Sequence, residues 1–137
     1  MIIKEYEYNK SIEEFILNEQ AKYEQKNGIV CNYKPFCFIA YENNEIVGLI
    51  AGSTYYSEVN IEELVVLEEH RGKKIGTKLI KTLEDIYKDK GYNNINAWTD
   101  EFQAPSFYEK MGFQLEYVRK DKNNSKLNKY FFVKFFK

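Results

Sequence analysis

The chain of 137 residues is poor in the residues that build metal centres and disulfide frameworks. It has one histidine, His70, and two cysteines, Cys31 and Cys37. With so few candidates no metal-ligand spacing exists, so we expect no metal, and we expect both cysteines to be reduced and structural. The chain also lacks an excess of either charge. Its formal net charge of −1 disfavours general binding to nucleic acid.

Long hydrophobic runs are absent as well. No window approaches the roughly 20 apolar residues that a membrane span needs, so we expect no contact with a membrane. Residues 2–8 alternate apolar with charged or polar residues, a pattern that predicts a strand rather than a secretion signal. We therefore expect a cytoplasmic protein. What remains, 44% hydrophobic and 30% charged residues, predicts one globular domain over 1–137.

Hydrophobic periodicity predicts ten elements in the order β-α-β-β-β-α-β-α-β-β. Ser11 to Glu14 fits a capping box that opens a helix ending at Asn27-Gly28. Asn43-Asn44 predicts a hairpin turn, and Pro105 fits the first turn of a short helix that ends at Met111-Gly112. A further helix begins at Ile75 and is closed by Gly91. The predicted strands are 2–8, 36–41, 46–54, 59–67, 94–99, 113–119 and 130–136. The pattern is that of a mixed sheet with helices on its faces.

The strand over 59–67 has an irregular period. Apolar residues occupy every second position from Val59 and again from Leu64, but the step between the two sets is three, across Glu62 and Glu63. One extra residue in a strand predicts a β-bulge, a feature that redirects backbone groups near active sites. The alternative is a strand buried on both faces, since the intervening positions near its end are also apolar.

This strand leads into a basic, glycine-containing loop, Arg71-Gly-Lys-Lys-Ile-Gly-Thr77, which opens directly into a helix. Such a junction points several backbone N–H groups and the positive end of a helix dipole at one spot, so it predicts a site for a phosphate or pyrophosphate. A Walker P-loop does not fit, because its second glycine, counted from Gly72, would fall at Thr77.

Between this strand and this helix, the loop resembles the acyl-CoA loop of the GNAT N-acetyltransferase superfamily, whose usual form is Gln/Arg-x-x-Gly-x-Gly/Ala. Ala104 to Phe113 resembles the late Ala-x-x-x-Tyr-x-x-x-Gly-Phe segment of the same family. The resemblance implies an α/β (mixed α+β) fold with a mostly antiparallel central sheet of about seven strands and three flanking helices. Two positions depart from the family: Lys74 replaces the middle glycine, and Glu101 replaces an asparagine that helps to hold the pantetheine arm.

The resemblance also implies acetyl-CoA as cosubstrate. Main-chain groups near the end of the strand would contact the acyl and pantetheine end, and the loop would wrap the pyrophosphate. The cofactor-binding residues implied in this way are Leu64, Val65, Val66, Arg71, Gly72, Lys73, Lys74, Ile75, Gly76 and Thr77.

The implied reaction is transfer of an acetyl group to a primary amine of a small molecule or peptide, by direct attack in a ternary complex. Glu62 and Glu63 are the candidates for the general base, unless both are solvated strand residues. The Val66 N–H could stabilise the developing oxyanion. Tyr108 matches the tyrosine that protonates the departing thiolate, and its alternative role is packing beside aromatic neighbours. His70 has no evident nucleophile partner and is assigned no role.

Two other functions stay open. The chain could be a non-catalytic acyl-CoA-binding module if Lys74 and Glu101 mark a decayed site. It could also bind nucleic acid through residues 71–74 and its aromatics, which the net charge disfavours. The oligomeric state is open between monomer and homodimer. The strand over 130–136 would leave an apolar edge for dimerisation if unpaired, or it simply completes the sheet.

Overall fold

The computed structural model describes all residues from 1 to 137, and the chain divides into two compact units, 1–32 and 33–137. Each unit is described by itself. That the whole chain forms one domain stays a prediction. None of the helices combines the length and the apolar content that crossing a bilayer requires.

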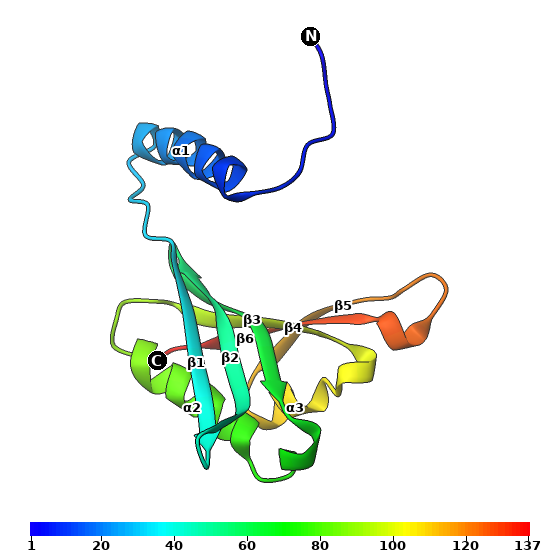
Figure 1. The fold of residues 1–137 in the computed structure, drawn as a ribbon. Helices are drawn as coiled ribbons and strands as arrows, with labels where there is room; N and C mark the ends of the chain where they lie inside the picture. The colour runs from blue at the N-terminus through cyan, green and yellow to red at the C-terminus, as the bar shows by residue number, and fades with distance from the viewer. The chain divides into compact units, whose positions relative to one another are not determined.

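The first unit contains one helix, α1 (Lys10–Lys26) (Figure 1). Its N-cap is Asn9, whose side-chain oxygen accepts from the backbone N–H of Ile12 at 3.0 Å. The predicted cap at Ser11 is therefore wrong: the helix begins at Lys10, so Ser11 lies within its first turn, and Asn9 caps it two residues earlier. Residues 2–8 form no strand, and this prediction is also wrong. Alternation supplies only the side-chain pattern, whereas a strand also needs a neighbouring backbone to bond with.

The second unit contains six strands and two helices, one strand fewer than the resemblance implied. The strands are β1 (Lys34–Glu42), β2 (Glu45–Tyr55), β3 (Glu58–Val66), β4 (Asn94–Asp100), β5 (Gln114–Arg119) and β6 (Lys129–Phe135). The helices are α2 (Ile75–Tyr87) and α3 (Ser106–Lys110), and single 3₁₀ turns cover Glu68–His70, Glu101–Gln103 and Ser125–Leu127. The α/β class and the three helices of the whole chain are confirmed.

The strands lie in one sheet in the order β1-β2-β3-β4-β6-β5 (Figure 1). Every pair is antiparallel except β3 and β4. The β1–β2 hairpin turns at Asn43 and Asn44, which have φ of 52° and 64°, as the Asn-Asn pair predicted. β6 lies between β4 and β5, so the C-terminal strand completes the sheet and has no free edge of its own for dimerisation.

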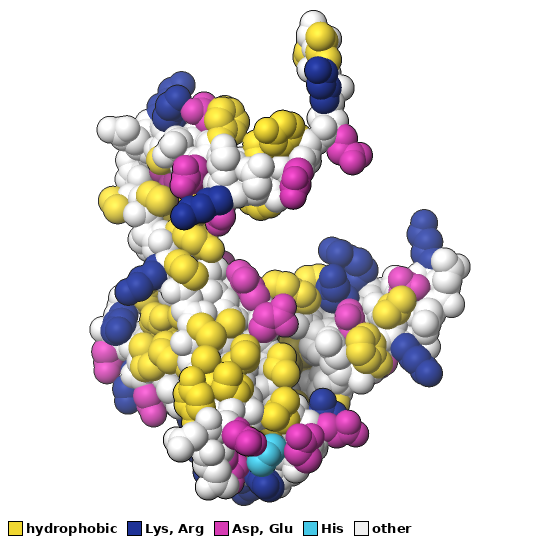
Figure 2. Space-filling model, viewed as in Figure 1, with side chains coloured by type: hydrophobic (Ala, Val, Ile, Leu, Met, Phe, Trp, Pro, Cys, Tyr) yellow, Lys and Arg dark blue, Asp and Glu magenta, His cyan; other side chains and the backbone are white.

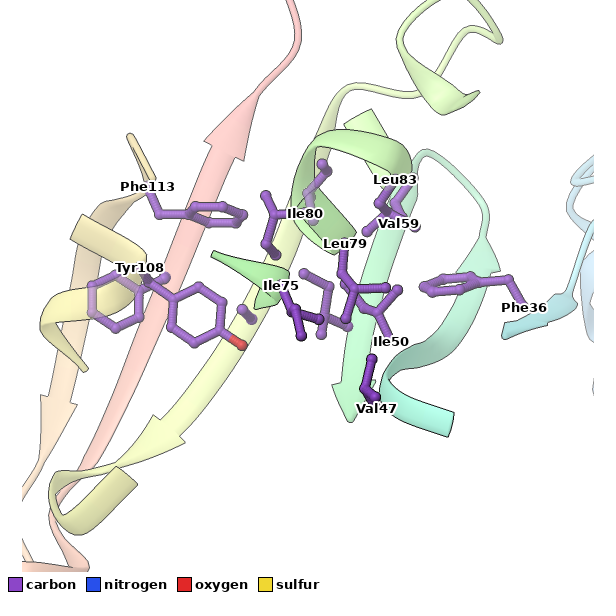
Figure 3. Packing of buried hydrophobic residues seen from close by; sticks show 14 residues of the cluster. Phe36, Val47, Ile50, Val59, Ile75, Leu79, Ile80, Leu83, Tyr108 and Phe113 are labelled. Carbon is purple, nitrogen blue, oxygen red and sulfur yellow. The ribbon is translucent and has the colours of Figure 1, made fainter. Parts of the chain in front are cut away.

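The core lies on one face of this sheet, where α2 and α3 both pack. Figure 3 shows Ile75, Leu79, Ile80 and Leu83 of α2 against side chains of β1, β2 and β3. Tyr108 of α3 belongs to the same buried cluster. This packing fixes the start of α2 and the position of α3 relative to the end of β3, and those three places form the candidate site.

Candidate active site

A pocket opens where β3 and β4 diverge. Their parallel ladder runs only from Glu58↔Asn94 to Ile61↔Ala97, so the second halves of both strands have no ladder between them. The resulting pocket has a volume of about 700 Å³. Its lining residues are Ile61, Glu62, Glu63, Leu64, Val65, Val66, Arg71, Gly76, Trp98, Thr99, Phe102, Gln103, Ala104, Phe107 and Tyr108.

The β-bulge predicted in this strand is present. Ala51 of β2 faces Glu63 and the next residue, Gly52, faces Ile61, which leaves Glu62 as the extra residue of β3. A Cβ atom on Gly52 would stand 1.9 Å from the carbonyl oxygen of Asn60. Only glycine therefore fits opposite the bulge, because any side chain would collide with the neighbouring backbone.

The bulge places both carboxylates on the sheet face opposite to α2. Ile61 and Leu64 both pack against the core, and in a regular strand two residues three positions apart would point to opposite faces. Glu62 and Glu63 lie between them and both turn away from the core. Glu62 Oε1 accepts from the Ser53 hydroxyl at 3.3 Å. The sequence left open which carboxylate faces the pocket, and both line it.

The backbone of β3 also directs N–H groups into the pocket between β3 and β4. The Leu67 N–H donates to Val47 O on β2 at 3.0 Å, and the N–H groups of an extended chain alternate between its two edges. The amides of Leu64 and Val66 are therefore directed to the other edge, toward the pocket. Consistent with this direction, the Val66 carbonyl accepts from Arg71 Nε at 3.3 Å.

The loop before α2 contains two left-handed residues, Gly72 with φ of 82° and Lys74 with φ of 63°. Lys74 is the N-cap of α2, and no side chain caps the first turn. Free N–H groups at such a helix start are a suitable site for an anion. The left-handed conformation explains why glycine is usual at the position of Lys74: glycine adopts it without strain, whereas the Cβ of lysine makes it less favourable.

The residues of this loop differ in which of their atoms a ligand can contact. The side chain of Ile75 is buried in the core, so only its backbone is available to a ligand. A Cβ on Gly76 would lie 3.3 Å from the Phe107 ring, so the start of α2 and α3 approach closely here. Of the ten predicted cofactor residues, five line the pocket and five lie outside it. The five outside are Gly72, Lys73, Lys74, Ile75 and Thr77.

Tyr108 lines the pocket from α3 and is buried. Its ring stacks on Phe132 at 5.5 Å between centroids and meets Phe107 and Phe113 edge-on at 5.4 Å each. Figure 3 shows its oxygen pointing toward Ile75 of α2. Burial raises the pKa of this hydroxyl to about 12, since the charged phenolate is poorly solvated there. The packing role and access to the pocket therefore coexist in one side chain.

Two residues singled out in the sequence lie outside the pocket. His70 Nδ1 lies 3.3 Å from Lys73 Nζ and 3.4 Å from a Glu42 carboxylate oxygen, in a surface cluster. Glu101 Oε1 accepts from the Tyr130 hydroxyl at 2.7 Å, and this hydrogen bond raises the pKa of that tyrosine. The Glu101 carboxylate is thus engaged beside β6, which accounts for its absence from the lining.

Sequence reasoning missed one wall of the pocket. Trp98 and Thr99 at the end of β4, and the turn that follows them, line it. The only signal was that Trp98 is the single tryptophan of the chain. Nothing in the local pattern shows where the β3–β4 ladder ends. No group of three or more His, Cys, Asp or Glu side chains is arranged to hold a metal ion.

Comparison with known proteins identifies the family. The profile of the Acetyltransferase (GNAT) family matches residues 3–113, and the chain belongs to this family. It is 31% identical over 93 residues to N-alpha-acetyltransferase 30 of Schizosaccharomyces pombe, covering 61% of each chain. The chain thus spans less than two thirds of the length of this curated relative.

Two solved structures extend the comparison. The fold resembles that of an acetyltransferase from Bacillus cereus, with 28% identity, a TM-score of 0.78 and coverage of 96% of this chain and 97% of the other. An aminoglycoside 6'-N-acetyltransferase complexed with coenzyme A shares the fold at 20% identity and a TM-score of 0.65, with coverage of 100% and 98%.

Proposed function

We propose that the protein transfers an acetyl group from acetyl-CoA to a primary amine in a ternary complex. The observation that carries this proposal is the pocket between β3 and β4, which joins two carboxylates, free strand amides and Tyr108 in one space beside a helix start. Membership of the acetyltransferase family supports it. So does the aminoglycoside 6'-N-acetyltransferase of the same fold, whose crystal structure is a complex with coenzyme A.

In this proposal the pyrophosphate binds at the start of α2, where the amides from Gly72 to Thr77 and the helix dipole attract an anion. The pantetheine arm then follows β3 into the gap. It bonds with the amides of Leu64 and Val66, which are directed away from β2. Lys73 and Lys74 are exposed and add a positive field for the phosphates. Glu101 makes no contact with the arm, because its carboxylate bonds to Tyr130.

The chemistry follows from the same positions. The amine nitrogen attacks the thioester carbonyl carbon as Glu62 or Glu63 accepts its proton. The Val66 N–H stabilises the oxyanion that develops on the carbonyl oxygen. Collapse of this intermediate breaks the carbon–sulfur bond and releases the thiolate of coenzyme A.

Tyr108 assists the leaving group as a hydrogen-bond donor. Its pKa of about 12 keeps the hydroxyl protonated throughout the physiological range. An ordinary thiol has a pKa of about 8.5, so complete proton transfer from Tyr108 to a thiolate is unfavourable. We therefore assign Tyr108 a hydrogen bond to the departing sulfur, and solvent completes the protonation of the thiol.

A thiol-release assay with acetyl-CoA against small amines and peptides tests the proposal. We expect amine-dependent release of free coenzyme A and, by calorimetry, binding of coenzyme A to the folded protein. Binding without transfer to any amine in a broad panel would instead select the non-catalytic acyl-CoA-binding module, in which Lys74 and Glu101 would mark a decayed site. Absence of binding would reject both functions.

The acceptor class and the location belong to the proposal as well. The acceptor is a small-molecule or peptide amine, and we propose a cytoplasmic protein that acts without nucleic acid or membrane, as a monomer or homodimer. Fractionation of the native cell tests the location, and light scattering of the purified protein tests the oligomeric state.

A further inference from the structure

An aromatic row lies on the sheet face that carries the two carboxylates. The side-chain bond from Asn96 to Asn60, 3.0 Å long, places both asparagines on this face, and Trp98 lies two residues further along β4. The register then sets Trp98 beside Phe131 of β6, and Phe131 beside Tyr117 of β5. Trp98 is 45% exposed and Tyr117 59%. The row therefore runs from the pocket toward the sheet edge as an open apolar platform.

Cations that form no ion pair border this platform. Two residues further along both strands, and so on the same face, Lys129 pairs with Arg119. The Arg119 guanidinium lies 5.3 Å from the centroid of the Phe131 ring. Figure 2 shows basic side chains gathered over the β5–β6 hairpin. The cations of this hairpin that enter no ion pair are Arg119, Lys120, Lys122, Lys126 and Lys129.

The acidic residues of the hairpin do not neutralise this charge. Only Glu116 and Asp121 are acidic between residues 114 and 135. Asp100 of β4 lies opposite Lys129 in the register, so three acidic residues stand against the five cations. Asp121 Oδ2 accepts from the backbone amides of Asn123 and Asn124 at 3.0 Å and 2.9 Å, so it is engaged in holding the turn. The chain as a whole has a net charge of −1. The hairpin is therefore a local basic surface that is complementary to an acidic partner.

The distance from the carboxylates to the cations sets the size of that partner. Paired strands are about 4.8 Å apart, and β3 and β4 separate beyond Ile61. The three steps from β3 through β4 and β6 to β5 therefore span at least roughly 15 Å. A small monoamine at Glu62 or Glu63 cannot reach Arg119. An extended peptide advances about 3.3 Å per residue, so at least about four to five residues are needed to cover the span.

We propose that the acceptor is an acidic peptide, whose terminal amine lies at Glu62 and Glu63 and whose following side chains cross the aromatic row to the cations of the β5–β6 hairpin. An apolar side chain next to the amine packs on Trp98, and acidic side chains three to five residues on bind Arg119 and Lys129. This inference rests on the proposed function, since it names the substrate class of the same site.

The test measures kcat/KM with acetyl-CoA for seven-residue peptides that share a free amino terminus and a leucine beside it. The peptides carry glutamate, glutamine or lysine at positions three to five. We expect the glutamate peptide to exceed the lysine peptide by at least about tenfold, and the difference to shrink at high salt.

The double variant Arg119→Gln/Lys129→Gln isolates the hairpin. It should lower kcat/KM for the glutamate peptide about five- to tenfold and leave the glutamine peptide within twofold. The matched control Lys81→Gln/Lys88→Gln removes two exposed charges from α2 and the residue that follows it, and should change neither value. Equal loss for the glutamate and glutamine peptides would overturn the assignment of the hairpin.

The two proposals fail in different ways. Turnover of all three peptides at equal rates overturns the acidic acceptor while it supports acetyl transfer. If no peptide is acetylated, the fluorescence anisotropy of labelled peptides measures their binding to the CoA-loaded protein. Tighter binding of the glutamate peptide than of the other two supports the acidic partner, and equal binding of all three overturns it. Displacement of the glutamate peptide by a single-stranded oligonucleotide at equal charge would also overturn it and assign the cations to nucleic acid.

Discussion

The Ser53 hydroxyl donates to Glu62 Oε1 at 3.3 Å, from β2 to the bulged residue of β3. The bond ties one of the two pocket carboxylates to its neighbouring strand, whereas no such side-chain bond orients Glu63. Of the two candidates for the general base, Glu62 is therefore the one with a defined orientation, which proton transfer in the transition state requires.

We expect Glu62→Gln to lower kcat by about 10²-fold or more, because an amide cannot accept the amine proton. Glu63→Gln should lower it less than about tenfold, through the lost attraction for a cationic amine. Steady-state rates at saturating acetyl-CoA compare the two variants, which are matched in charge and in chemistry. Calorimetry with coenzyme A should give equal affinities. A larger loss in Glu63→Gln would reverse the assignment.

Gly52→Ala should destabilise the second unit by roughly 3 kcal/mol or more, because its Cβ would meet Asn60 O at 1.9 Å and the bulge would have to open. Denaturant unfolding measures the loss. Gly91→Ala is the comparison: Gly91 has φ of 87° with open space around a Cβ, so it reports backbone strain alone, of about 1 kcal/mol. Equal losses would mean that the strand accommodates a side chain opposite the bulge.

Tyr108→Phe should keep the affinity for coenzyme A and lower kcat by about 10- to 100-fold, because only the hydrogen bond to the departing sulfur is removed. The ring packing on Phe132 is retained, so the fold should persist. Phe107→Leu serves as a packing control. We expect it to lower the free energy of unfolding more than it changes kcat or the affinity for coenzyme A. Unchanged turnover in Tyr108→Phe would leave Tyr108 with a packing role only.

The same residue predicts a pH dependence of stability. The pKa of Tyr108 is about 12 in the folded protein, against about 10 for an ordinary tyrosine. Above pH 10 the unfolded chain releases this proton and the folded one keeps it, so the free energy of unfolding falls as pH rises from 10 to 12. The loss approaches about 3 kcal/mol.

Tyr108→Phe should lack this loss. The difference between wild type and variant, followed by urea titration from pH 9 upward, cancels the contribution of the other tyrosines. A constant difference over that range would show that the hydroxyl is solvated.

Lys74→Gly should raise the free energy of unfolding by about 0.5–1 kcal/mol, because glycine adopts the left-handed N-cap conformation without strain. Affinity for coenzyme A should fall less than tenfold, since the backbone N–H remains and only one exposed charge is lost. Lys73→Gly is the matched control: Lys73 is not left-handed, so glycine there should give no gain in stability. Equal effects of the two changes would exclude relief of strain as the cause.

Local chemistry made much of the fold predictable from the sequence. The Asn43-Asn44 turn, α2 and the strands of the second unit follow from residue type and period, which act over a few positions. The bulge was also predictable, because an extra residue shifts the alternation of apolar side chains. The strand over 2–8 and the Ser11 cap were wrong because a local pattern leaves alternatives open. Alternation does not supply a partner strand, and Asn9 offers a cap two residues before Ser11.

Only the tertiary structure decided which residues share the pocket. Whether Glu62 and Glu63 face the same side depends on the register of β3 against β2, and the pocket exists because the β3–β4 ladder ends at Ile61. The row from Trp98 to Tyr117 joins three strands whose order does not follow the chain. Register and strand order are set by contacts between distant segments and by the packing of α2 and α3, which no local pattern of residues encodes.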